Sequence, residues 1–159
     1  MRILFFNFFI MNKKYLAIIV LAFLGIINAA YLSHQAYLAL NPDMLSFLNG
    51  SFCDINETFS CTNFLAQPES RVFGIPFPWI AAVVYPVIFL LALIGNAKKS
   101  ALITKTIMIL AFCGLAFNGY VIYNEATIGV FCPLCMMCTG YILTIGILAA
   151  IILKNKELK

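Results

Sequence analysis

Two pairs of cysteines in this sequence have spacings that are typical of disulfide chemistry. Cys53 and Cys61 have seven residues between them, and Cys132 and Cys135 form a Cys-Pro-Leu-Cys motif. The unpaired N–H groups and the dipole at a helix start stabilise a thiolate, so a pair placed there exchanges readily. Pro133 suits the first turn of such a helix, where its missing N–H costs nothing. The pattern predicts Cys132 facing incoming thiols and Cys135 turned inward, toward the other helices.

Other interpretations of the cysteines remain open at this stage. Cys53 and Cys61 are also compatible with a plain stabilising disulfide. A zinc site formed by the four paired cysteines is a further alternative, although no histidine lies near them. The remaining two, Cys113 and Cys138, are expected to be small buried apolar residues. On a helical wheel Cys138 lies about 120° away from Cys132, so it points elsewhere.

The elements that position these cysteines are predicted to be membrane-spanning helices. The 159-residue chain is 64% hydrophobic and only 10% charged, with a mean hydropathy of +1.01. A soluble domain has about 25% charged residues. This composition excludes an ordinary soluble domain, a disordered chain and a nucleic-acid-binding module. Residues 15–38, 76–95, 101–123 and 131–153 are each long and apolar enough to cross a bilayer. We therefore expect one domain over residues 1–159, an all-α integral membrane bundle of four helices.

The charged residues predict the orientation of this bundle. Nine of the ten basic residues lie at the amino end, in the second connection or at the carboxyl end. The positive-inside rule then places both termini in the cytoplasm, with the loop over residues 39–75 and a short connection over 124–130 facing outward. The outward side would hold one basic residue, Arg71, and five of the six acids: Asp43, Asp54, Glu57, Glu69 and Glu125.

The long outward loop is too apolar to be an ordinary solvated segment. Its polar residues are interleaved with large apolar ones: Phe47, Leu48, Phe52, Ile55, Phe59, Phe64 and Leu65. We expect the loop to lie on the outer mouth of the bundle, the alternative being that it rests among lipid headgroups. In the third helix, Asn118 is an amide within an apolar stretch, and such a group needs a partner.

Three motifs in this order resemble the vitamin K epoxide reductase family, particularly its bacterial members. They are Cys53-Asp-Ile-Asn-Glu-Thr-Phe-Ser-Cys61, then Arg71-Val-Phe-Gly-Ile-Pro76, then Cys132-Pro-Leu-Cys135. The resemblance implies a four-helix bundle around a quinone of the ubiquinone or menaquinone type, capped by the first loop. By the same resemblance Cys53 and Cys61 are the shuttle pair, and Cys132 and Cys135 are the redox pair that faces the quinone.

The resemblance also implies where the quinone binds. Phe73 and Gly74 match the family's Phe-Gly beside the quinone pocket, so they are expected to contact the ligand together with Cys135 and Thr139. Two positions depart from the family pattern. Gln67 stands where a serine or threonine is common, and Thr139 stands where some animal members have a tyrosine that bonds the quinone. The Thr139 hydroxyl can bond a ligand near Cys135 or bond back to its own helix.

Together these observations predict a thiol:quinone oxidoreductase of the plasma (inner) membrane that promotes disulfide formation outside the cytoplasm. Vitamin K epoxide itself is not the expected substrate, because of the two departures. Many bacterial members carry a fused thioredoxin-like domain; this sequence ends at Lys159, so a separate extracytoplasmic thioredoxin-like protein is the expected partner. One alternative is a quinone or quinone-epoxide reductase whose product is the reduced quinone. Another is a non-enzymatic membrane scaffold with a structural disulfide, which leaves the Cys-Pro-Leu-Cys motif unexplained.

Overall fold

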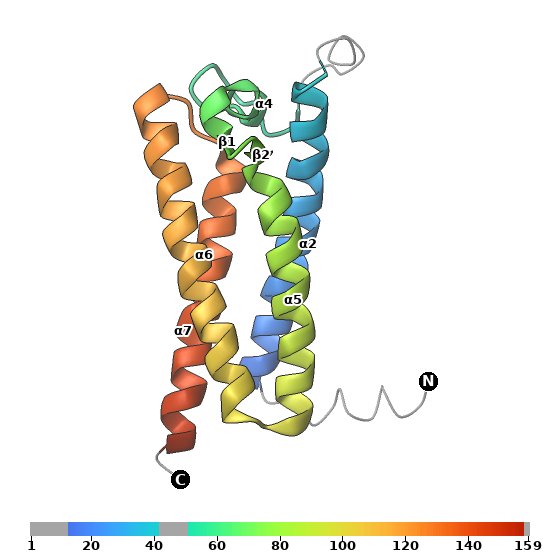
Figure 1. The fold of residues 1–159 in the computed structure, drawn as a ribbon, viewed down its shortest axis with the longest axis vertical. Coiled ribbons are helices and arrows are strands. Elements are labelled where there is room, and N and C mark those ends of the chain that lie inside the picture. The colour runs from blue at the N-terminus through green and yellow to red at the C-terminus, as the bar shows by residue number, and fades with distance from the viewer. Residues whose placement is uncertain (1–12, 42–50, 158–159) are drawn as a thin grey trace, which may run out of the picture.

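Four long helices packed side by side form the molecule (Figure 1). A computed structural model describes residues 13–41 and 51–157. The long helices are α2 (Lys13–Ala39), α5 (Phe77–Lys98), α6 (Ala101–Ile128) and α7 (Pro133–Glu157). The predicted fold class, an all-α four-helix bundle with a loop between the first two long helices, is confirmed.

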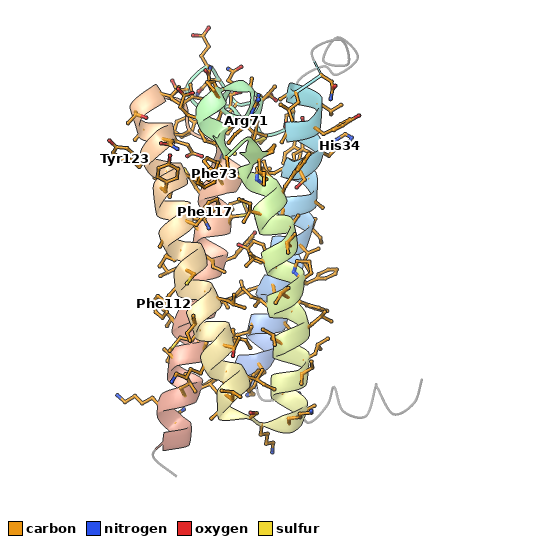
Figure 2. All side chains as sticks on the ribbon, viewed as in Figure 1. His34, Arg71, Phe73, Phe112, Phe117 and Tyr123 are labelled. Atoms are coloured by element: carbon orange, nitrogen blue, oxygen red, sulfur yellow. A yellow bond between two sulfur atoms is a disulfide. The ribbon has the colours of Figure 1, made fainter. Side chains whose placement is uncertain are left out.

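Each long helix is able to cross a membrane by its length and composition. The helices contain 22 to 28 residues, or about 33–42 Å at 1.5 Å per residue. The hydrocarbon core of a bilayer is about 30 Å thick. Many of their outward side chains are large and apolar, and Phe112, which projects from the middle of α6, is an example (Figure 2). The chain is therefore a multi-pass membrane protein.

The largest difference from the predicted helix boundaries occurs at the end of α6. The sequence predicts an end near residue 123, whereas the helix continues to Ile128. It ends where Gly129 adopts a left-handed conformation and donates its N–H to the carbonyl of Glu125, which is a common glycine cap. No glycine or proline interrupts the chain between 124 and 128. The prediction that Glu125 belongs to an outward connection is therefore wrong, because this residue lies within the last turns of α6.

Short elements occupy the segment between α2 and α5. They are α4 (Cys61–Ala66), the 3-10 helix η1 (Pro68–Ser70) and the strands β1 (Arg71–Val72) and β2 (Ile75–Pro76). The two strands pair in an antiparallel hairpin with only Phe73 and Gly74 between them. Both of these residues have positive φ, +52° and +81°, which is the backbone that a tight two-residue hairpin requires.

This segment covers one end of the bundle. Phe64 and Leu65 of α4 are fully buried against residues from all four long helices, which confirms that this part of the loop lies on the mouth of the bundle. Phe52 and Ile55 are instead more than two-thirds exposed, at 74% and 71%. Phe47 and Leu48 lie outside the described residues.

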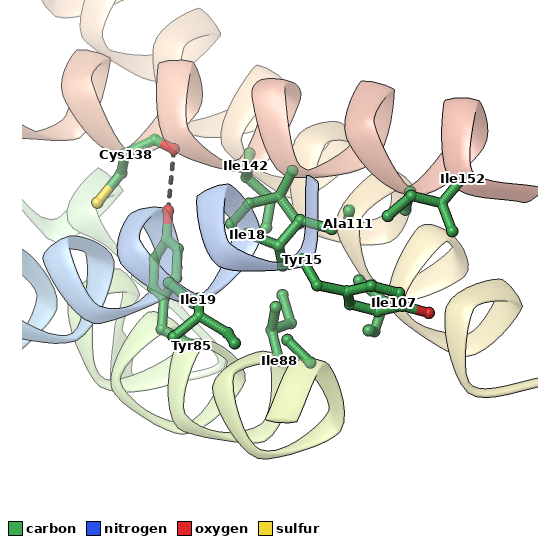
Figure 3. Close-up of a cluster of buried hydrophobic side chains, with 14 of the residues drawn as sticks. Tyr15, Ile18, Ile19, Tyr85, Ile88, Ile107, Ala111, Cys138, Ile142 and Ile152 are labelled. Carbon is green, nitrogen blue, oxygen red and sulfur yellow. Dashed lines mark hydrogen bonds between the residues drawn. The ribbon is translucent and has the colours of Figure 1, made fainter. Parts of the chain in front are cut away.

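A second buried cluster fills the other half of the bundle with isoleucine, alanine and tyrosine side chains (Figure 3). Its polar atoms form hydrogen bonds between helices. The Tyr15 hydroxyl lies 2.5 Å from the Thr104 hydroxyl, and the Tyr85 hydroxyl donates to the carbonyl of Cys138 at 2.9 Å. Asn28 of α2 donates to the carbonyl of Leu134 at 3.0 Å. The last two bonds fix the first turns of α7 against α2 and α5.

Candidate active site

Backbone pairing brings the loop cysteines to the start of α7. Phe59 forms an isolated parallel bridge with Phe131. The Ser60 N–H donates to the carbonyl of Phe131 at 3.0 Å, and the Phe131 N–H donates to the carbonyl of Thr58 at 2.7 Å. Cys61 and Cys132 come soon after the paired residues in their own segments. Two residues 71 positions apart in the sequence therefore become neighbours.

The sulfur atoms of the two pairs are in contact. Cys53 and Cys61 form a disulfide, whereas Cys132 and Cys135 are thiols. The Sγ of Cys132 lies 3.1 Å from the Sγ of Cys61, and the Cys135 N–H donates to the Sγ of Cys132 at 3.4 Å. A thiol so close to a disulfide sulfur has the arrangement needed for thiol–disulfide exchange. Because Cys53 and Cys61 are bonded to each other, the four cysteines do not form a zinc site in this state.

The four paired cysteines are excluded from water. Their side chains are at most 7% exposed and belong to one apolar cluster with Leu32, Phe64 and other residues. Cys132 caps the first turn of α7, since its carbonyl accepts the N–H groups of Cys135 and Met136. As the Cys-x-x-Cys motif predicts, one cysteine of this pair faces the loop disulfide and the other lies deeper in the bundle.

Asp54 holds the loop around the disulfide. Its carboxylate accepts hydrogen bonds from the Ser60 hydroxyl, the Thr62 hydroxyl and the N–H groups of Ser51 and Thr62, at 2.7 to 3.0 Å. Burial alone would raise the pKa of the Asp54 carboxyl. The hydrogen bonds from Thr62, Ser60 and Ser51 more than offset this effect and hold the pKa below its ordinary value. The charged form of Asp54 therefore stabilises the turn that positions Cys61.

An apolar cavity of about 250 Å³ begins on the far side of the redox cysteines. Its walls come mostly from α5 and α6, with Cys135 and Cys138 of α7 at one side. Asn118 of α6 contributes an amide to the wall, and no hydrogen bond to it occurs within the described residues. Cys113 lines the cavity and is also exposed on the surface of the bundle. The cavity therefore reaches the side of the bundle that would face lipid.

Several predicted site residues lie away from this cavity. Phe73 is fully exposed at the tip of the β1–β2 hairpin, near Arg71 (Figure 2), and neither Phe73 nor Gly74 lines the cavity. The Thr139 hydroxyl donates to the carbonyl of Cys135 at 3.1 Å, so it bonds back to its own helix. A contact between these three residues and a quinone stays a prediction.

Of the two remaining cysteines, Cys113 departs from the expected burial and Cys138 matches it. Cys113 is exposed rather than buried, because its helix face borders the cavity mouth. Cys138 is buried, at 4% exposed, and its sulfur accepts a hydrogen bond from Asn28 at 3.3 Å. Cys138 shares the cavity wall with Cys135, because residues three apart are neighbours on a helix surface.

Sequence reasoning missed the carboxyl group of this site. Glu125 is fully buried, and its carboxylate oxygen and the sulfur atoms of Cys132 and Cys135 lie within 4.8 Å of one another. Within the described residues neither carboxylate oxygen has a hydrogen-bond partner. The available signal was a single acid near the end of a long apolar stretch, seven residues before Cys132. It was overlooked because α6 was expected to end too early.

Comparison with known proteins agrees with the arrangement of the cysteines. No curated protein sequence matches the chain. The family model described as "Vitamin K epoxide reductase family" matches residues 16–151, which include the four paired cysteines, the hairpin and most of each long helix. This match covers well over half of the sequence, and the chain therefore belongs to the vitamin K epoxide reductase family.

Proposed function

We propose that this protein is a membrane thiol:quinone oxidoreductase that promotes disulfide formation outside the cytoplasm. Its family consists of quinone-reductase-type oxidoreductases that use a quinone substrate. The observation that carries the finer proposal is the 3.1 Å contact between the sulfurs of Cys132 and Cys61, with Cys135 on the wall of an apolar cavity. A purely structural loop disulfide does not account for a thiol placed against it.

The first step is reduction of the loop pair by a thioredoxin-like protein with two thiols. The partner's thiols become a disulfide, and Cys53 and Cys61 each gain one electron and one proton. Because Cys61 faces Cys132, we assign Cys53 as the cysteine that exchanges with the partner. Cys53 is only 4% exposed, although the preceding residue, Phe52, is exposed. Access by the partner therefore requires this part of the loop to move.

The second step passes the electrons from one pair to the other. The Cys61 thiol loses its proton and attacks the Cys132 sulfur of a Cys132–Cys135 disulfide, which forms a mixed disulfide and releases the Cys135 sulfur to take up one proton. The Cys53 thiol then loses its proton and attacks Cys61, which restores the loop disulfide and releases the Cys132 sulfur to take up the second proton. The products are an oxidised loop pair and a reduced Cys132–Cys135 pair, which is the combination present in the structure.

The last step reoxidises Cys132 and Cys135 next to the cavity. The cavity suits a quinone ring, since its walls are apolar and include a cysteine sulfur and the free amide of Asn118. When bound, a quinone supplies an acceptor for two electrons and two protons. The chain's own residues form the Cys132–Cys135 disulfide, donate a hydrogen bond from Asn118 to a ligand oxygen, and exclude water.

The distribution of charge supports an outward-facing loop. The start of α2, the α5–α6 turn and the end of α7 lie together at one end of the bundle, opposite the loop elements (Figure 1). The basic residues described at that end are Lys13, Lys14, Lys98, Lys99, Lys105 and Lys154. By the positive-inside rule that end faces the cytoplasm, and the loop disulfide then lies in an oxidising compartment.

Quinone reduction by the purified protein tests this proposal. We expect the protein in lipid nanodiscs to reduce short-chain ubiquinone or menaquinone analogues with dithiothreitol or a reduced thioredoxin-like protein as donor. The Cys135→Ala variant, a matched control with unchanged loop cysteines, should show no reduction above the protein-free rate. A wild-type rate equal to that of Cys135→Ala with both donors and both quinones would overturn the proposal.

A further inference from the structure

The polar groups that act on the buried carboxyl of Glu125 belong to the redox pair: the backbone of Cys132 and the side chain of Cys135. The side chain is 0% exposed, and within the described residues both of its carboxylate oxygens lack a hydrogen bond. Glutamate is almost never fully buried unless it is paired, because an isolated charge is very costly in an apolar surrounding. A carboxyl group that adds nothing to stability at this position calls for a chemical role.

The backbone fixes Glu125 beside the redox pair. Its carbonyl accepts the N–H groups of Gly129 and Val130 at 2.9 and 3.2 Å, so the last turn of α6 is capped around it. Only four residues separate Ile128 from the start of α7 at Pro133. This short connection holds the Glu125 carboxyl and the sulfurs of Cys132 and Cys135 within 4.8 Å of one another.

Thiol chemistry at a site without water needs a local proton carrier. A thiol must lose its proton before it attacks a disulfide, and the released thiolate must gain one unless a bare charge is left behind. Cys132 and Cys135 are 0% and 7% exposed, so bulk water does not reach them. The attacking Cys61 lies against Cys132, so the proton that it loses needs a carrier to reach the departing Cys135 sulfur.

The other titratable groups around Glu125 leave the carboxyl as the suitable carrier. These groups are the thiols of Cys132, which immediately precedes α7, and of Cys135 on α7. Cys138, one turn further on, acts on Cys135. On η1 the Glu69 side chain is exposed to solvent. No lysine, arginine or histidine is among the groups that act on Glu125 within the described residues.

We propose that Glu125 carries the proton for the Cys132–Cys135 pair in both directions. When Cys61 attacks Cys132, the Cys132–Cys135 bond breaks, the departing Cys135 sulfur takes the proton from the Glu125 carboxylic acid, and the carboxylate regains the proton that the attacking loop thiol has lost. When the pair is reoxidised, two electrons and two protons pass to the acceptor, and Glu125 takes up the Cys135 proton as it gives its own proton to the acceptor. Glu125 is neither oxidised nor reduced. Distances above 3.2 Å in a site without substrate commonly shorten when the reacting complex forms.

This inference rests on the exchange between pairs in the proposed function, and a quinone-free experiment separates the two. Protein with both pairs oxidised is mixed with dithiothreitol, quenched with acid at set times, alkylated, and analysed by mass spectrometry. The loop pair is expected to be reduced in a first phase and Cys132–Cys135 in a second. Absence of the second phase in the wild type would contradict the proposed electron path rather than the role of Glu125.

The isosteric variant Glu125→Gln should slow the second phase by about 10²-fold or more, the usual effect of removing a general acid. The first phase should be unchanged, and the pH profile of the second phase should lose its carboxyl component. Glu69→Gln, which changes an exposed acid at the same end of the bundle, should alter neither phase. A second phase in Glu125→Gln within about twofold of wild type, with the same pH profile, would overturn the inference.

Infrared difference spectroscopy on the unmutated protein gives an independent answer if Glu125→Gln does not fold. Oxidation of Cys132–Cys135 by a soluble disulfide should change the C=O stretching band of a protonated carboxyl group, and Glu69→Gln should leave this change intact. A wild-type difference spectrum without a carboxyl band would also overturn the inference. A merely structural glutamate would give no redox-dependent band.

Discussion

The two buried clusters of the bundle differ in their residue composition and in the hydrogen bonding of their polar groups. The cluster shown in Figure 3 consists mainly of isoleucine, alanine and tyrosine, and its hydroxyl groups are bonded between helices. The cluster beneath the loop contains four cysteines and borders a cavity. Beside it lies Glu125, whose carboxylate oxygens have no hydrogen-bond partner in the part of the chain that the structure describes.

This difference separates the part of the bundle that gives stability from the part that reacts. Satisfied polar groups and close packing stabilise a helix bundle. Unsatisfied groups and empty space cost free energy, and they persist where chemistry requires them. Substitutions in the loop-end cluster should therefore change rates, whereas substitutions in the isoleucine-rich cluster should change stability.

The largest expected effect is loss of turnover when a redox cysteine is removed. Cys132→Ala and Cys135→Ala should each abolish dithiol-dependent quinone reduction, because Cys132 contacts the loop disulfide and Cys135 borders the cavity. Cys113→Ala and Cys138→Ala should keep most of it, measured as the initial rate in the nanodisc assay. If Cys138→Ala were as inactive as Cys132→Ala, the assignment of the pair would be wrong.

Removing the carboxylate that holds the loop should slow exchange between the pairs. In Asp54→Ala the turn before Cys61 loses an acceptor of four hydrogen bonds, and displacement of a reacting group by about 1 Å can cost about 10²-fold in rate. Thiol trapping with mass spectrometry measures the exchange rate. Thr62→Val, which removes only one of these bonds, should have a smaller effect. Equal rates in Asp54→Ala and wild type would contradict this role.

The pH dependence of the loop follows from the same carboxylate. The pKa of Asp54 is lower in the folded protein than the ordinary value of 3.8. The stabilisation of the loop by the Asp54 carboxylate is therefore complete when the pH is above the ordinary pKa. It is lost as the pH falls through the lower folded-state value. In the wild type, the reduced loop cysteines should become more accessible to alkylation at acidic pH. The control variant Asp54→Asn should show no such change with pH. Asp54→Asn should already be loose at neutral pH.

In the isoleucine-rich cluster, Gly25→Ala should lower stability. A Cβ at Gly25 would lie 2.3 Å from ring carbons of Tyr85, so α2 and α5 must separate or the ring must move. Overpacking of this kind costs about 1–3 kcal/mol. Gly119→Ala is the matched control, because a Cβ there meets nothing within 4 Å. Thermal unfolding in nanodiscs compares the two, and equal midpoints would show that this contact is not tight.

The smallest effect is expected at the amide on the cavity wall. Asn118→Leu removes the hydrogen-bond donor proposed for a quinone oxygen, at about 0.5–1.5 kcal/mol for one bond. The KM for quinone should rise by about 2- to 13-fold, while thiol exchange in quinone-free protein should be unchanged. A larger decrease in the thiol exchange rate than in quinone affinity would indicate that Asn118 contributes to packing rather than to ligand binding.

The sequence predicted the helices and the cysteine pairs, because both depend on local patterns. Long apolar stretches define the spans, and Cys132-Pro-Leu-Cys135 contains its own helix start. The place of Glu125 depended on where α6 ends, and apolar composition does not determine helix boundaries. The contact of Cys61 with Cys132 depends on pairing of Phe59 with Phe131, which no local signal indicates. The cavity arises from the packing of four helices, so single residues did not identify its walls.

Trapping the bond between the two pairs tests the central claim most directly. In Cys53→Ala the remaining loop thiol has no partner in its own pair, so non-reducing mass spectrometry should find peptides joined through Cys61 and Cys132. In Cys61→Ala a bond from Cys53 to Cys132 should be absent, since Cys61 is the loop cysteine whose sulfur contacts Cys132 within the described residues. Absence of the Cys61–Cys132 bond in Cys53→Ala, with full activity toward a thioredoxin-like donor in both variants, would contradict the account.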